Sequence, residues 1–453
     1  MWEILLTCFY IILFGFIILR ARFFKNLGLP PKLFLGVFLL KIAFGTLLFL
    51  IYTIYYQDRE TADIFKYFDD SLYMTQALWD KPADFFKMLF GIQNDTPYFN
   101  EAYYNKMNNW FRVYESSMYN DSHTIIRFNA VVRIFSFGFY HVHTVVMCFI
   151  SLLGLTALYK AVFPFAKAKS KEFFAVIFLL PSALFWGSGV LKEGLLFFGF
   201  GFLILSMIRI SKRKDMVYNT GLFLFSITLL LYLKFYVLAA LSVGIFGYLL
   251  TAFTGTKKAL LKYMVAFAII AIAGLNIHHV FPGFNVLELL VTKQKDFIGL
   301  ATYEESGSQF EMAPLEPTPS SFILNAPEAL LNSFFRPFPQ HADSPFMLMA
   351  TVENVLVFIA LGLLLCYFKK PDSPVTNLTY FFLFSGLILF LIVGWTTPVS
   401  GALVRYKIPG VMMLLLAGIF IYDRNRFKKL LVRIKLKKQK LNPLFDNLTE
   451  EIS

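Results

Sequence analysis

Apolar segments long enough to cross a membrane recur along the whole chain of 453 residues. A transmembrane helix needs about 20 mainly apolar residues, and 57% hydrophobic with 16% charged residues exceeds the usual content of a soluble domain. No polar linker divides these segments, so we predict an all-α, polytopic integral membrane protein with about eleven transmembrane helices in one bundle, residues 1–422. The predicted spans are 2–19, 35–55, 139–162, 173–185, 194–208, 217–232, 237–253, 263–275, 346–368, 378–393 and 408–422.

Basic residues gather in alternate loops, including 20–32 and 211–215. Because positively charged loops stay in the cytoplasm, we place the N-terminus outside and a basic tail, residues 423–453, in the cytoplasm. Two long loops, about 57–137 and 276–345, then lie outside. This bias accounts for the net charge of +13, so we expect membrane lipids and no nucleic acid as partners, and nothing indicates a protein partner. The tail is a solvated stop signal or, alternatively, an interfacial helix on anionic headgroups.

Lys192 and Glu193 stand side by side inside an apolar stretch that runs from residue 173 to residue 210. A charged pair at that depth is costly, so it needs a structural or functional reason. The functional interpretation is that Lys192 holds a phosphate while Glu193 fixes the position of the lysine. The structural alternative is a mutually satisfied ion pair that closes a helical hairpin.

Further polar residues also fall on the outer face, against the usual bias of basic residues toward the cytoplasm. Arg and Lys are natural partners of phosphate, so an anionic ligand near the outer leaflet would explain them. Together with Lys192 and Glu193, we assign to a substrate-binding site the residues Lys234, Tyr236, Arg336, Arg405, Tyr406, Asp69 and Asp70. For Lys234 and Tyr236, the alternative is a snorkelling lysine beside an interfacial tyrosine.

Asp63 follows the second predicted span closely, so its carboxylate should lie near the membrane surface. There it could be the catalytic general base that accepts a proton from a hydroxyl nucleophile. A solvated acidic loop or a helix cap is the alternative for Asp63, Asp69 and Asp70. We assign no metal ligand and expect no cofactor, although Asp69 and Asp70 could recruit a divalent cation.

Asp63 and Tyr67 form a D-x-x-x-Y pattern that resembles the first periplasmic loop of GT-C membrane glycosyltransferases. The segments PSALFWGSGVLKE, LKFY, RPFP and TTPVSGALVRYKIP together look like a set found in bacterial polysaccharide-biosynthesis membrane proteins. GT-C enzymes commonly carry a tight pair of acids in this loop, whereas here Asp63 stands alone, with Asp69 and Asp70 further on. The resemblance implies that Asp63 is the general base of an enzyme in the bacterial inner membrane. That enzyme would move a sugar from a polyprenyl-phosphate-linked donor to an acceptor on the periplasmic face.

In this hypothesis Lys192, Lys234, Arg336 and Arg405 surround the donor phosphate and stabilise the charge that develops on it. A polymerase or ligase of O-antigen type is the first alternative, because it would use the same lipid-linked sugars with outer Arg and His residues but no essential carboxylate. A transporter of lipid-linked glycans is the second, since intramembrane charges and broken hairpins suit it. A non-enzymatic membrane scaffold is the third. The glycosyltransferase hypothesis requires that the outer cations meet in one cavity, facing an acid.

Overall fold

The computed structural model describes residues 1–111, 119–303, 306–341 and 344–429, and these residues fold into helices without named strands. Within this described part, nine helices are long and apolar enough to cross a membrane, or ten with one bent pair. The prediction of an all-α, multi-pass membrane protein is therefore confirmed. The spans are α1 (Trp2–Arg20), α2 (Pro31–Leu50, continued by a π-helical turn Ile51–Tyr56), α7 (Tyr140–Val162), α10 (Lys192–Ser211), α11 (Met216–Leu233), α12 (Phe235–Thr254), α13 (Ala259–Asn276), α17 (Pro345–Cys366), α18 (Ser373–Thr396) and the pair α19 (Ser400–Tyr406) and α20 (Ile408–Ile421), bent by 49°.

The fourth predicted span, 173–185, is two short helices instead of one. These are α8 (Ser170–Phe178) and α9 (Pro181–Trp186), separated at Leu179 and Leu180. Proline has no backbone N–H and its ring collides with the preceding turn, so Pro181 opens a new helix where α8 has ended. This break explains why the described residues hold ten candidate spans and not eleven.

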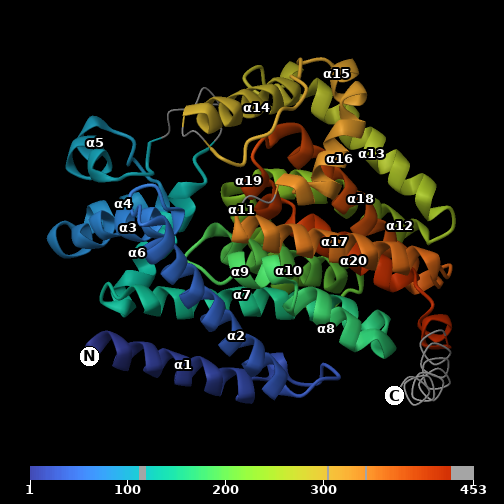
Figure 1. Ribbon diagram of the computed structural model, residues 1–453, viewed down its shortest axis with the longest axis horizontal. Helices are drawn as coiled ribbons and strands as arrows, with labels where there is room; N and C mark the ends of the chain where they lie inside the picture. The colour runs from blue at the N-terminus through green and yellow to red at the C-terminus, as the bar shows by residue number, and fades with distance from the viewer. Residues whose placement is uncertain (112–118, 304–305, 342–343, 430–453) are drawn as a thin grey trace, which may run out of the picture.

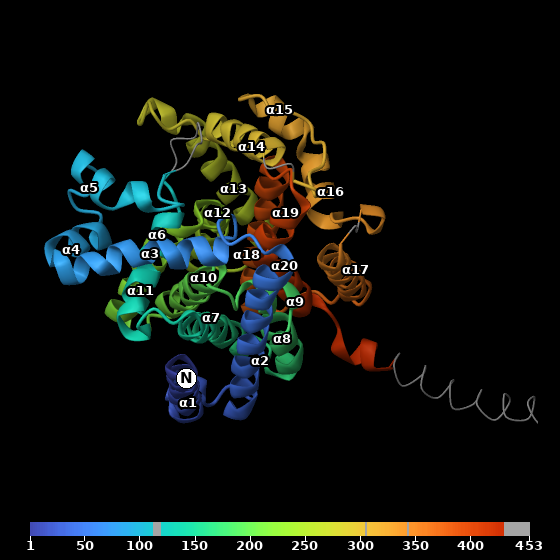
Figure 2. The same ribbon diagram turned by 60° about the vertical axis from the view of Figure 1, so that its left-hand side comes forward.

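The centre of the bundle is the contact between α7 and α10, both largely buried. A Cβ atom added at Gly154 of α7 would collide with the backbone of Phe197, and one at Gly201 of α10 would collide with the carbonyl of Gly154. Small residues allow helix backbones to approach closely in a membrane, where helices associate through packing and hydrogen bonds. Around this centre, α1, α13 and α17 expose most of their apolar side chains, as lipid-facing helices do. Figure 1 shows α1 along the lower edge of the molecule and α13 along its upper right edge, and Figure 2 shows α17 at the side of the bundle.

The predicted outer loop 57–137 is mostly helical. It comprises α3 (Asp63–Asp80), α4 (Pro82–Phe90), α5 (Pro97–Ala102) and α6 (Ser122–Ser136), which lie at the end of the molecule that holds the N-terminus (Figure 1). In Figures 1 and 2, α4 and α5 project from the side of the bundle. Arg133 of α6 holds α3 in place, because its guanidinium donates to the carbonyl of Phe68 (2.6 Å) and to the hydroxyl of Ser71 (3.1 Å).

The second predicted outer loop, 276–345, holds α14 (Val286–Tyr303), α15 (Pro319–Leu324) and α16 (Ala326–Phe335). Of these, α14 and α16 pack against α18. At the other end of the molecule, Arg424 at the start of the basic tail pairs with Glu172 at 2.8 Å. The rest of the predicted tail, beyond residue 429, lies outside the described residues.

Candidate functional site

A cavity of about 2150 Å³ lies where α3, α6 and α14 meet the membrane-spanning helices. Its walls come from segments that are far apart in the sequence: the end of α2, the starts of α3, α6 and α10, and residues of α9, α14, α17 and α19. Both Lys192 and Arg405 line it. Of the four cations that the hypothesis places around the donor phosphate, Lys192, Lys234 and Arg405 share this cavity.

Arg405 connects two acids from different helices. Its Nε donates to Oε1 of Glu193 at 2.6 Å, and its Nη1 donates to Oδ2 of Asp63 at 2.9 Å. The two acids differ in burial, because the Glu193 side chain is 1% exposed while the Asp63 side chain is 38% exposed. One guanidinium thus joins the starts of α3 and α10 to α19. The planar fork of arginine suits such a double contact.

Glu193 has a second cationic neighbour. Lys234, between α11 and α12, places its Nζ 3.9 Å from Oε1 of Glu193 and 4.3 Å from the ring centre of Tyr406. The rings of Tyr236 and Tyr406 lie 5.6 Å apart beside it. The alternative of a lysine that snorkels to the interface does not fit, since Lys234 is 4% exposed and faces an acid and an aromatic ring.

Lys192 points away from Glu193 although the two residues are adjacent. Its Nζ donates to Oδ1 of Asp121 at 2.8 Å and to Oγ of Ser122 at 3.2 Å, and it lies 5.0 Å from the ring centre of Tyr67. Each member of the predicted pair therefore binds a residue from another helix, and neither simply neutralises the other. We did not predict Asp121 and Ser122, although a helix start at the end of a long outer segment was a readable signal.

The cluster is balanced in charge: Asp63, Glu193 and Asp121 face Lys192, Lys234 and Arg405. Burial alone would raise the pKa of Asp63, but the nearby Arg405 and then Lys192 bring it below its usual value. Asp63 is therefore a carboxylate at neutral pH. Burial raises the pKa of Tyr67 well above its usual value, so its phenol stays neutral there.

Arg336 is not brought to this cluster. Its Nε donates to Oδ1 of Asn332 at 2.8 Å, its guanidinium carbon lies 3.8 Å from the ring centre of Phe310, and it does not line the cavity. The expectation that Arg336 joins the other cations was wrong. Its place at the end of α16 turns the side chain back along its own helix, and the sequence did not reveal that packing.

Asp69 and Asp70 are also absent from the cavity wall. Asp69 forms a bidentate ion pair with Arg59, with N–O distances of 2.7 and 2.9 Å. Asp70 accepts backbone N–H bonds from Asn108 (2.7 Å) and Asn109 (2.8 Å), and burial raises its pKa to about 6 against the lowering effect of those bonds. Both aspartates organise the outer segment instead. Across the described ranges, no group of three or more His, Cys, Asp or Glu side chains could hold a metal ion.

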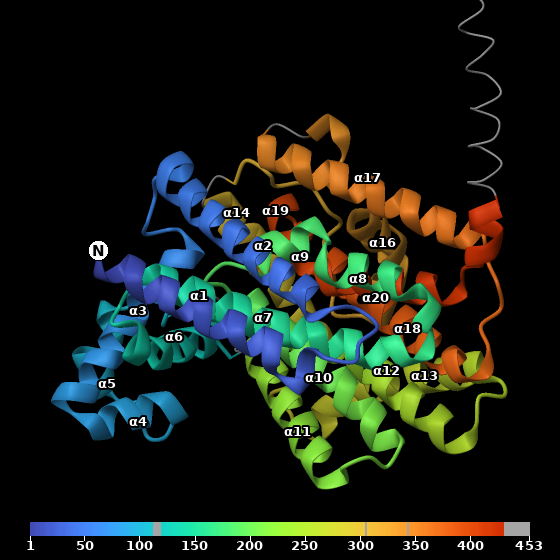
Figure 3. The ribbon, with the colours of Figure 1, turned by 90° about the horizontal axis from the view of Figure 1, so that it is seen from below.

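The rest of the cavity wall divides by chemistry. Part of the wall is charged, because Lys66 of α3 and Lys293 and Lys295 of α14 line the cavity together with Asp58 and Asp296. Another part is apolar and is built from α2, α9 and α17, by Phe44, Ile51, Phe185, Trp186, Phe346, Val352 and Leu356. In Figure 3, α2 and α17 lie on either side of α9, which contacts both. The cavity therefore combines a charged region with an apolar wall between lipid-facing helices.

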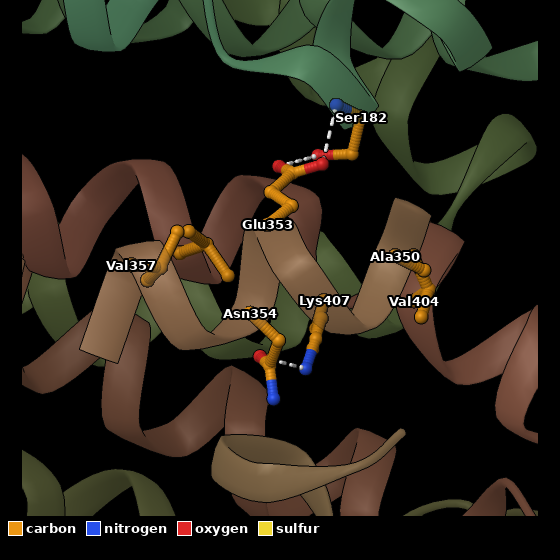
Figure 4. Close-up of a pocket in the computed structure, with 8 residues that line it drawn as sticks. Ser182, Ala350, Glu353, Asn354, Val357, Val404 and Lys407 are labelled. Atoms are coloured by element: carbon orange, nitrogen blue, oxygen red, sulfur yellow. Dashed lines mark hydrogen bonds between the residues drawn. The ribbon is translucent and has the colours of Figure 1, made fainter. Parts of the chain in front are cut away.

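A second polar cluster supports the helix that carries Arg405 (Figure 4). Glu353 of α17 accepts hydrogen bonds from the backbone N (2.8 Å) and Oγ (2.7 Å) of Ser182 in α9. Lys407, at the bend between α19 and α20, donates to Oδ1 of Asn354 at 2.8 Å and to two backbone carbonyls. The space among these residues is about 20 Å³, room for roughly one water molecule. The cluster ties the bend to α17.

We did not predict Glu353 or Lys407. An acid inside the apolar segment 346–368 was a visible signal, because charged residues within a span usually face the bundle interior. Comparison with family models, with curated proteins and with solved structures gives no match to this chain. A functional assignment therefore has to come from the geometry described above.

Proposed function

We propose that this protein is a glycosyltransferase of the bacterial inner membrane, with its N-terminus outside and its C-terminus in the cytoplasm. It would move a sugar from a polyprenyl-phosphate-linked donor to an acceptor on the periplasmic face. The observation that carries the proposal is the contact of Asp63 with Arg405 in a cavity that also holds Lys192 and Lys234. A carboxylate that faces several cations suits a reaction that removes a proton at one point and releases a phosphate at another.

The donor phosphate would lie against Arg405, Lys192 and Lys234. These side chains are largely buried, and hydrogen bonds to charged groups are worth more in such surroundings than in water. The polyprenyl chain would follow the apolar wall formed by α2, α9 and α17. The lipid-exposed face of α17 allows the chain to continue into the bilayer.

In the proposed reaction, Asp63 accepts the proton of an acceptor hydroxyl. The acceptor oxygen forms a bond to the anomeric carbon of the sugar while the bond from that carbon to the phosphate oxygen breaks. The electron pair leaves with the polyprenyl phosphate, and Arg405, Lys192 and Lys234 stabilise the added negative charge.

The test is transfer in lipid nanodiscs, with labelled polyprenyl-phosphate sugars supplied one at a time and acceptor fractions from a bacterial envelope. Asp63→Asn and Arg405→Ala should both abolish the labelled product. Loss with Arg405→Ala alone would favour a polymerase or ligase that needs no carboxylate. That alternative has one observation in its favour, since Asp63 is already paired with Arg405. Movement of an intact labelled donor across the bilayer without a new product would favour a transporter.

A further inference from the structure

The two acids bound to Arg405 are not equivalent. Glu193 is 1% exposed, so without Arg405 its carboxylate would stay buried in the bundle, with Lys234, at 3.9 Å, as its remaining cation. Loss of the closest partner of a buried charge is strongly unfavourable. Asp63 is 38% exposed and lines the cavity, where its carboxylate can be hydrated when it leaves Arg405. Of the two contacts, the one with Asp63 is therefore the easier to break.

The charge balance of the cluster favours such a break when an anion arrives between Arg405, Lys192 and Lys234. Arg405, Lys192 and Lys234 each already lie beside an acid. A phosphate placed among them adds negative charge to a neutral cluster, and like charges at close range oppose each other. The anion therefore competes with an acid for a cation. Asp63 is the acid that can move toward solvent at the lowest cost.

We propose that Arg405 exchanges Asp63 for the phosphate of the lipid donor, while Glu193 stays hydrogen-bonded to Nε of Arg405 as a positioning residue. This inference rests on the proposed function, and it adds an order to the reaction. Before the donor binds, Asp63 is held by Nη1 of Arg405. The donor phosphate takes that position and releases the carboxylate, which then faces the acceptor hydroxyl. The base is thus released only when a donor is present.

The exchange has a consequence that a simple binding site would not have. Asp63 and the phosphate compete for Arg405, so each weakens the binding of the other by the same factor. Removal of the Asp63 charge should therefore tighten anion binding, although Asp63 lies within the site. For a residue that only binds the donor, the same substitution would weaken binding or leave it unchanged.

The experiment measures binding of farnesyl phosphate to the full chain in nanodiscs, without an acceptor. Tryptophan fluorescence is a suitable signal, because the Trp186 ring centre lies 5.4 Å from the guanidinium carbon of Arg405. The chain has five tryptophans, so a Trp186→Phe variant identifies the part of the signal that comes from this site. Inorganic phosphate, titrated separately, distinguishes a lipid phosphate from a free anion.

Asp63→Asn should lower the Kd for farnesyl phosphate by roughly tenfold, within the usual range of coupling between sites. Asp58→Asn is the matched control, because Asp58 also lines the cavity but its carboxylate accepts hydrogen bonds from Glu60 and Thr61 and not from Arg405. Its Kd should stay within about twofold of the wild-type value, since no cation is released. If Asp63→Asn lowers the Kd for inorganic phosphate but not for farnesyl phosphate, the exchange at Arg405 holds, but the ligand is a free anion and not a lipid phosphate.

Two other outcomes distinguish a failure of the exchange from a failure of the proposed function. If farnesyl phosphate binds but Asp63→Asn leaves the Kd unchanged, or shifts it no more than Asp58→Asn does, the exchange is refuted and the proposed function remains. If neither farnesyl phosphate nor inorganic phosphate binds the wild-type protein or Asp63→Asn, the donor assignment fails, and the exchange fails with it.

Discussion

The guanidinium of Arg405 lies 2.9 Å from the carboxylate of Asp63, although 342 positions of sequence separate the two residues. Asp63 begins α3 in the first outer segment, and Arg405 lies in α19 just before the bend into α20. The contact forms only when the N-terminal and C-terminal parts of the bundle pack together. Any substitution that loosens that packing will also lower activity, so each functional variant needs a measurement of folding beside it.

Replacement of Arg405 by lysine should impair the protein even though it keeps the charge. Arginine binds Glu193 through Nε and Asp63 through Nη1, and a single ammonium group cannot reproduce that fork. Loss of one hydrogen bond to a charged group is worth about 1.5–3 kcal/mol, so we expect kcat/KM for transfer to fall by at least about tenfold. Lys66→Arg, elsewhere on the cavity wall, should stay near the wild-type value. Full activity in Arg405→Lys would mean that charge alone is required.

The pH dependence of transfer should differ between the free protein and the donor complex. In the proposed reaction Asp63 acts as a carboxylate, so transfer should be lost as pH falls through its pKa. In the free protein Arg405 brings that pKa below its usual value, against the effect of burial, and the acid limb of kcat/KM should therefore lie below the pH at which an ordinary aspartate titrates. The charged groups that act on Asp63 are Arg405, Lys192 and Lys66.

When the donor phosphate takes Arg405, Asp63 loses the contact that lowers its pKa. The acid limb of kcat, which reports the donor complex, should then lie at higher pH than the limb of kcat/KM. The measurement is a pair of initial-rate profiles between pH 4 and pH 8, with thermal unfolding followed at each pH. Coincident limbs would show that donor binding leaves the surroundings of Asp63 unchanged.

Asp70 should make the stability of the outer segment depend on pH. Its pKa is about 6 in the folded protein and near 3.8 in an unfolded chain, with burial as the main cause. The folded state therefore keeps a proton that the unfolded state releases between those values, and stability falls as pH rises through that window. A pKa difference of about two units lowers the free energy of unfolding by roughly 3 kcal/mol, and this loss is complete above about pH 6.

The measurement for Asp70 is the midpoint of thermal unfolding in detergent from pH 4 to pH 7. Asp70→Asn should remove this part of the pH dependence, because an amide does not titrate. Asp80→Asn, at the exposed end of the same helix, is the matched control and should follow the wild-type curve. Parallel curves for wild type and Asp70→Asn would contradict the prediction.

The fold and the site were accessible from the sequence to different degrees. The lengths of the apolar segments predict the helices because the bilayer sets how many residues a span needs. The placement of Asp63, Lys192, Lys234 and Arg405 on one side followed from the alternation of basic loops, and the structure brings these four residues together. Charge bias along the chain thus predicted that these four residues lie near one another, before any contact was known.

The sequence did not predict which side chains pair with one another in that region. Which helices are neighbours depends on side-chain packing, so the pairing of Lys192 with Asp121 had no local signal. The same limit explains Arg336, whose side chain binds Asn332 one turn earlier in α16. Loop charges place a residue on one side of the membrane, but they do not give the direction of its side chain.

The close approach of α7 and α10 supplies a prediction about stability that does not depend on the function. Gly201 lies against the backbone of Gly154, and a methyl group there has no space. Gly201→Ala must push the helices apart, and overpacking of this kind typically costs about 1–3 kcal/mol. Gly221 of α11 has no atom near the place of an added Cβ, so Gly221→Ala should keep or slightly raise the unfolding midpoint. Thermal unfolding in detergent, with gel filtration to detect aggregation, compares the two variants. Equal midpoints would show that α7 and α10 do not touch at Gly201.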